Sequence, residues 1–284
     1  MKNIKVNENI SVVMKSLVLT IAAVFLMVLM LSLMRSIGLN IFNNSLLVNA
    51  LFKSLLIIVP CLIIRKYNKG NLLSSIGLGN NKYGVKYVFI GIGMGLICGM
   101  LAFAALFLMK IGFYEGTGFK FYTSKIVIVF MITVFLRACT TAVCEEVFFR
   151  GVLLNYLSRY KGKTFGLLVS SIIFTAPHLT RYKRVDELCF VLIGGIVLGY
   201  LYVKTESLYM SVGVHFAIDF FMNLTGIKNE VGFLILRINP AYSLQYFEQS
   251  IFLLLSLMYL ILLFILILIN KNKKEKGIIK GNVI

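Results

Sequence analysis

The stretch Cys144-Glu145-Glu146-Val147-Phe148-Phe149-Arg150 places two adjacent carboxylates and an arginine between apolar residues. Carboxylates, together with histidine, are the side chains that most often move protons in enzymes. The chain has only two histidines, His178 and His215, and both fall within later apolar runs. These residue types predict an acid–base site inside an apolar environment.

The spacing of the charges separates the two glutamates. Glu146 and Arg150 are four residues apart, so on a helix they can form an ion pair that only holds the structure together. Glu145 lies about 100° around the helix from Glu146 and needs another partner. A charge at the centre of a bilayer costs about 2.5 to 3.5 kcal/mol, so an intramembrane carboxylate without a structural partner suggests function.

Both histidines stand in positions where a helix can aim them. Pro177 precedes His178 and lacks an amide N–H, so it should loosen the helix just before the imidazole. His215 and Asp219 share one helix face, and Asn223 extends that face by another turn. If the polar turn near residues 160–163 joins two helices, Glu145 and His178 lie at a similar depth, about 25 Å along each arm. The sequence therefore allows one cluster: Glu145, Glu146, Arg150, His178, His215 and Asp219.

The elements that must position these residues are membrane spans. The chain of 284 residues is 59% hydrophobic and only 14% charged, with a mean hydropathy of +0.91. This composition excludes an ordinary soluble domain. Long uncharged runs predict spanning helices at 17–34, 88–109 and 251–269. Weaker runs, two of them interrupted by Lys53 and Arg137, bring the prediction to about eight spans: 46–64, 126 onward, 164–179, 188–203 and 207–221.

The predicted fold is an all-α polytopic membrane protein in a single domain, residues 1–284, with a four-helix catalytic core at 120–225. Glycines four apart, at 91, 95 and 99 and at 195 and 199, predict close helix packing within the chain. The polar connections 65–86 and 110–125 are expected to be loops with an interfacial piece. The first apolar run is expected to be a retained anchor, because no small-residue cleavage pattern follows it.

The basic residues predict the orientation of the chain in the membrane, and the cysteines exclude two kinds of site. With the amino terminus inside, 17 Lys/Arg fall on the cytoplasmic side and 9 on the other, so both termini are expected in the cytoplasm. The net charge of +18 favours anionic membrane lipid over nucleic acid as a partner. The five cysteines are scattered in apolar runs, which fits neither a disulfide framework nor a CxxC metal site.

Three motifs in order, EExxxR at 145–150, FxxxH at 174–178 and HxxxD at 215–219, resemble the CPBP family of intramembrane proteases. That family includes type II CAAX prenyl proteases and the bacterial Abi, or bacteriocin self-immunity, proteins. The resemblance covers residues 120–225 and implies an integral protein of a bacterial cell membrane. It implies an endopeptidase whose partner is a peptide or protein substrate, possibly lipidated or membrane-bound.

The resemblance also implies residue roles. Glu145 with His178 activates water, Glu146 is tied to Arg150, and His215 with residue 219 stabilises the oxyanion. Asp219 replaces the commoner Asn. An ionised Asp cannot donate a hydrogen bond, so either Asp219 is protonated or it only orients His215. The expected cofactor is none.

Rival interpretations stay open at the level of sequence. A zinc protease could use Glu145, His178 and His215 as ligands, although no HExxH helix is present. A cysteine protease could be built on Cys144, which would need a histidine beside its thiol. Outside proteolysis, a non-catalytic membrane immunity or partner protein, or a proton-coupled transporter, could also carry such a polar cluster.

Overall fold

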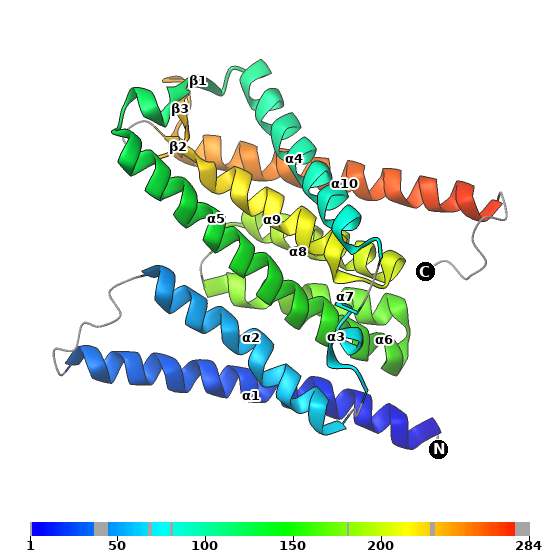
Figure 1. The fold of residues 1–284 in the computed structure, drawn as a ribbon. Coiled ribbons are helices and arrows are strands. Elements are labelled where there is room, and N and C mark those ends of the chain that lie inside the picture. Colours follow the sequence, from blue (N-terminus) through cyan, green and yellow to red (C-terminus); the bar gives the residue numbers. More distant parts are fainter. Residues whose placement is uncertain are drawn as a thin grey trace.

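The computed structural model describes residues 2–36, 45–67, 70–79, 82–180, 182–227 and 231–275. The chain is largely helical (Figure 1). The long helices are α1 (Lys2–Ser36), α2 (Ser45–Tyr67), α4 (Gly84–Leu108), α5 (Ser124–Glu146), α8 (Val185–Thr205), α9 (Leu208–Leu224) and α10 (Leu244–Glu275). Shorter helices are α3 (Leu72–Ser75), α6 (Asn155–Lys161) and α7 (Lys163–Thr175). Met1 and residues 276–284 lie outside the described part, so the predicted side of the two termini stays a prediction.

The predicted all-α polytopic membrane fold is confirmed. Among the described residues, five helical segments are long and apolar enough to cross a membrane: Asn7–Leu33, Gly84–Leu108, Ser124–Lys161, Val185–Thr205 and Leu244–Asn272. Leu208–Leu224 is apolar but shorter. Large apolar side chains such as Phe25, Leu108 and Phe264 point outward and are more than half exposed. Such surfaces suit contact with lipid rather than water. The count of eight spans stays a prediction.

Two groups of helices enclose the chain's polar centre. Figure 1 shows α1 beside α2 on one side of the molecule, and α4, α9 and α10 together on the other. One buried apolar cluster joins α1, α2, α6 and α7, and a second joins α4, α8, α9 and α10. The segment after α5 contributes Val152 and Leu153 to the first cluster. The polar side chains at the end of α5 therefore lie between the two apolar clusters.

Glycines allow the helices around the site to pack closely, as predicted. A Cβ on Gly91 of α4 would lie 2.3 Å from the Met210 carbonyl oxygen of α9, so only glycine permits this approach. Gly95 and Gly99 continue the same face toward α9. On α8, Gly195 faces Phe174 and Ser171 of α7. The glycine pattern therefore serves packing within the chain.

A small sheet replaces one of the predicted loops. Residues 110–125 contain strand β1 (Gly112–Thr117) and a short 3₁₀ turn, Gly118–Lys120. Strand β1 pairs antiparallel with β3 (Leu234–Ile238), with a bulge between Tyr114 and Gly116, and β3 pairs in parallel with β2 (Thr225–Ile227). The sequence predicted a loop with an interfacial piece here and not this sheet, because the partner strand lies more than a hundred residues away. The connection 65–86 contains α3 in its described part.

Candidate functional site

Glu145 and Glu146 are the last residues of α5, where the backbone changes its winding. Residues Val147–Leu154 form a π-helical segment that runs directly into α6. All eight of its residues are buried. π-helical turns within α-helices are rare and are frequent at functional sites. The sequence predicted only a helix here, and local residue types give no clear signal for the change of winding.

Arg150 holds Glu146 in a fully buried ion pair, as the four-residue spacing predicts. Its Nη1 donates to Glu146 Oε1 at 2.7 Å, and the two side chains are 1% and 0% exposed. Arg150 Nη2 donates to the Gly195 carbonyl oxygen at 3.1 Å. The guanidinium carbon also lies 4.4 Å from the centre of the Phe174 ring. Arg150 thus connects the π segment with α7 and α8.

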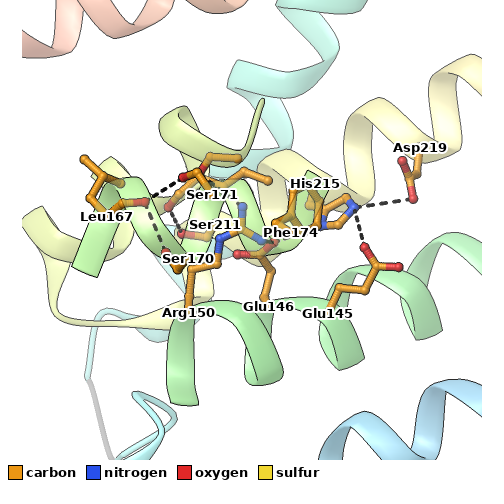
Figure 2. Close-up of polar contacts among 12 residues, drawn as sticks. Glu145, Glu146, Arg150, Leu167, Ser170, Ser171, Phe174, Ser211, His215 and Asp219 are labelled. Atoms are coloured by element: carbon orange, nitrogen blue, oxygen red, sulfur yellow. Dashed lines mark hydrogen bonds and ion pairs between the residues drawn. The ribbon is translucent and has the colours of Figure 1, made fainter. Parts of the chain in front are cut away.

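His215 of α9 lies between three carboxylates (Figure 2). Its Nδ1 donates to Glu146 Oε1 at 2.9 Å, which assigns a proton to Nδ1 because a carboxylate only accepts. Its Nε2 lies 3.9 Å from Glu145 Oε2 and 3.6 Å from Asp219 Oδ2. Glu146 therefore orients the ring, and the opposite nitrogen is aimed at Glu145 and Asp219.

Glu145 has a cationic partner that sequence reasoning missed. The Lys53 ammonium of α2 donates to Glu145 Oε1. The Lys53 and Glu145 side chains are 16% and 7% exposed. In the sequence, Lys53 was interpreted only as a break in an apolar run. A charged residue within a predicted span suggests a function, and this argument applies to Lys53 as it does to Glu145.

His178 lies beyond the end of α7, in the 3₁₀ segment Ala176–Thr180. The α-helix ends at Thr175, in agreement with the predicted loosening at Pro177. His178 Nδ1 lies 3.0 Å from the Phe174 carbonyl oxygen, so the proton of the neutral ring belongs on Nδ1 and Nε2 is the basic nitrogen. The ring stacks on Tyr182 with centroids 5.9 Å apart.

Phe174 brings the two histidines into one neighbourhood. Its ring centroid is 5.2 Å from that of His178 and 6.1 Å from that of His215. The same ring carries the Arg150 guanidinium on its face. The first residue of the FxxxH motif is therefore a packing centre of the site, and the role of His178 in pairing with Glu145 stays a proposal.

Asp219 and Asn223 lie further along α9 toward its end. The Asp219 carboxylate is 32% exposed and faces His215 one turn away. Asn223 is exposed, and its Nδ2 donates to the main-chain oxygen of Asp219 at 2.7 Å. Asp219 thus joins the cluster through its side chain, whereas Asn223 contacts its backbone.

Two carboxylate oxygens of the cluster are buried without a hydrogen-bond donor in the described part of the chain. They are Glu145 Oε2 and Glu146 Oε2. Buried polar atoms are normally hydrogen-bonded to protein or to water, because leaving them unpaired costs about 1 to 3 kcal/mol. Glu145 Oε2, which faces His215 Nε2 across 3.9 Å, is therefore positioned to accept from a small hydrogen-bond donor.

The structure gives less support to a zinc site or a cysteine nucleophile. No three His, Cys, Asp or Glu side chains in the described ranges are grouped closely enough to hold a metal ion. All five cysteines are free, as predicted, but only Cys98 and Cys144 are buried and Cys189 is exposed. Carboxylates and His215, rather than a metal cluster, dominate the polar centre.

Comparison with known protein families gives a match to the middle of the chain. Residues 126–221 match the family model described as Type II CAAX prenyl endopeptidase Rce1-like. Neither a curated protein nor a solved structure matches the chain. The matched segment holds every residue of the three motifs, and the match agrees with the resemblance of these motifs to the CPBP proteases.

Proposed function

We propose that the protein is an intramembrane endopeptidase of the CAAX-protease type that uses Glu145 to activate water. The observation that carries this proposal is the arrangement of Glu145 Oε2 and His215 Nε2, buried and 3.9 Å apart. A direct hydrogen bond is too long at this separation, but a water molecule can bridge the two atoms. The family match to prenyl endopeptidases supports peptide hydrolysis as the reaction.

The proposed reaction follows from these positions. Glu145 takes a proton from water while the water oxygen adds to the scissile carbonyl carbon, and the carbonyl π electrons move to its oxygen. His215 donates a hydrogen bond from Nε2 to this oxyanion. Glu145 then gives its proton to the peptide nitrogen while the oxyanion reforms the C=O bond and the C–N bond breaks, which leaves a carboxylic acid and an amine.

The neighbouring groups have supporting roles in this proposal. Glu146 accepts from His215 Nδ1 at 2.9 Å and so fixes the direction of Nε2. Arg150 neutralises Glu146. His178 accepts a hydrogen bond from the attacking water through Nε2, and Asp219 orients His215. No metal takes part in these steps, and zinc held by Glu145, His178 and His215 is the competing mechanism.

The substrate is proposed to be a peptide or protein at the membrane, with or without a lipid attached. The test uses purified protein in lipid vesicles and pairs of peptides identical in sequence, one prenylated at a C-terminal cysteine and one not. Mass spectrometry reads the cleavage sites. Comparison of peptides accumulating in cells with wild type or Glu145→Ala protein identifies the natural substrate. Absence of any cleavage that depends on Glu145 would contradict the proposal.

A further inference from the structure

Each glutamate of the site has its own cation, but the two cations come from different parts of the chain. Arg150 binds Glu146 from the adjoining π segment. Lys53 binds Glu145 from α2, 92 residues earlier in the sequence. Lys53 also lies outside residues 126–221, the segment that matches the prenyl endopeptidase family. The helix α2 therefore adds a side chain to a site whose motif residues all come from the matched segment.

The location of Lys53 requires an explanation. It stands within α2, where Phe52 precedes it and Ser54 and an apolar run follow, and its side chain is only 16% exposed. A charged side chain that is largely buried among apolar residues is costly unless it is paired. Pairing with Glu145 offsets this cost, and an uncharged residue would avoid the cost altogether. The charge is therefore useful to the site rather than to the packing of α2.

The contact gives the two oxygens of Glu145 different partners. Oε1 accepts from Lys53, while Oε2 has no donor in the described residues and faces His215 Nε2. A carboxylate that is bound through one oxygen cannot rotate freely, so the other oxygen keeps its direction. The Lys53 charge also favours the ionised carboxylate, which is the form that accepts a proton.

We propose that Lys53 is a positioning residue that holds Glu145 ionised with Oε2 directed at the attacking water. Lys53 contacts neither the substrate nor the reacting atoms in this arrangement. The inference rests on the proposed function of Glu145 as the base. It also makes α2 necessary for activity, so the family-matched segment alone would be insufficient.

The first test compares Lys53→Met with Lys53→Arg in vesicles. Loss of the charge should lower kcat about 10- to 100-fold, because a displacement of about 1 Å at a reacting group can cost 100-fold. KM should change less than about twofold, since Lys53 does not touch the substrate. Lys53→Arg keeps the charge and should retain most of kcat. Arg137→Met removes an exposed cation from another apolar helix and should leave kcat unchanged.

Two results would overturn the proposal. In the first, Lys53→Met has the same kcat as wild type. In the second, Lys53→Arg and Arg137→Met lose as much kcat as Lys53→Met does. If Lys53→Met does not accumulate, Lys53→Arg decides: full kcat supports a charge requirement, and a loss as large as that of Glu145→Gln contradicts it.

The second test needs no enzymatic activity. A double-mutant cycle with Lys53→Met and Glu145→Gln measures their coupling through the thermal stability of detergent-solubilised protein. Residues in contact give non-additive effects, whereas independent residues give additive ones. Non-additive shifts in Tm support the pair, and additive shifts overturn it. If wild type cuts no peptide while the cycle is non-additive, the proposed protease function fails and the Lys53–Glu145 pair still stands.

Discussion

His215 Nδ1 lies 2.9 Å from Glu146 Oε1, the same oxygen that accepts from Arg150 Nη1 at 2.7 Å. One carboxylate oxygen therefore connects a fully buried cation on the π segment with an imidazole on α9. This connection fixes the His215 ring so that Nε2 points to Glu145 and Asp219. The two adjacent glutamates thus have different partners, because Glu146 binds Arg150 and His215 whereas Glu145 binds Lys53.

Removal of Arg150 should mainly destabilise the folded protein rather than change the chemistry of the site. Arg150→Met leaves the Glu146 carboxylate buried without its cation, a change that typically costs about 3 to 5 kcal/mol. It also removes the bond to the Gly195 oxygen and the contact with Phe174. The measurement is the Tm of detergent-solubilised protein. The control is Arg159→Met, which removes an exposed arginine nearby in the chain. An Arg150→Met protein as heat-stable as wild type would show that the ion pair is not structural.

The close approach of α4 and α9 gives a prediction with a matched control. Gly91→Ala places a Cβ 2.3 Å from the Met210 oxygen and 3.0 Å from the Val214 nitrogen, both backbone atoms. The helices must separate, at a cost of about 1 to 3 kcal/mol. Gly93 of the same helix has no atom within 4 Å of such a Cβ. Gly93→Ala should therefore stabilise the helix by about 0.5 to 1 kcal/mol. The Tm should rise slightly as a result. Equal effects of both substitutions would contradict the packing of α4 on α9.

Asp219 is the position where this chain departs from the commoner asparagine of the family it resembles. If Asp219 orients His215, Asp219→Asn should retain activity, because its side-chain oxygen can still face Nε2 one turn away. Asp219→Leu removes this acceptor and should lower kcat by about 100-fold or less. Initial rates on the same peptide measure both. An inactive Asp219→Asn protein with wild-type Tm would show that the ionised carboxylate itself is required.

Metal dependence separates the proposed mechanism from its main rival. A catalytic zinc needs three protein ligands, and its removal should abolish activity. Glu145 is already bound to Lys53, and His215 to Glu146. We therefore expect activity to survive dialysis against a strong chelator, with no stoichiometric zinc in the purified protein. About one zinc per chain, lost and restored together with activity, would establish the zinc mechanism instead.

The relationships that could be predicted from sequence are those within a few residues. Four-residue spacing predicted the Glu146–Arg150 pair and the common face of His215 and Asp219, and both contacts are present. Pro177 predicted a loosened helix near His178, and the α-helix ends at Thr175, just before it. Local spacing determines such contacts because a helix places these positions on one side.

The features that could not be predicted depend on distant segments or on subtle winding. Lys53 meets Glu145 only because α2 packs against α5, and no spacing rule connects positions 92 residues apart. The pairing of β1 with β3 has the same cause. The π segment after Glu146 could not be predicted, since its residue types also suit an ordinary α-helix.

In the proposed mechanism, Glu145 is the base that activates water. The most direct measurement is the initial rate of peptide cleavage by wild type and by Glu145→Gln in vesicles, at equal amounts of folded protein. The glutamine keeps the size of the side chain but cannot take a proton from water. We predict that Glu145→Gln abolishes cleavage while its Tm still shows a folded protein. Cleavage by Glu145→Gln at a rate close to wild type would contradict the account.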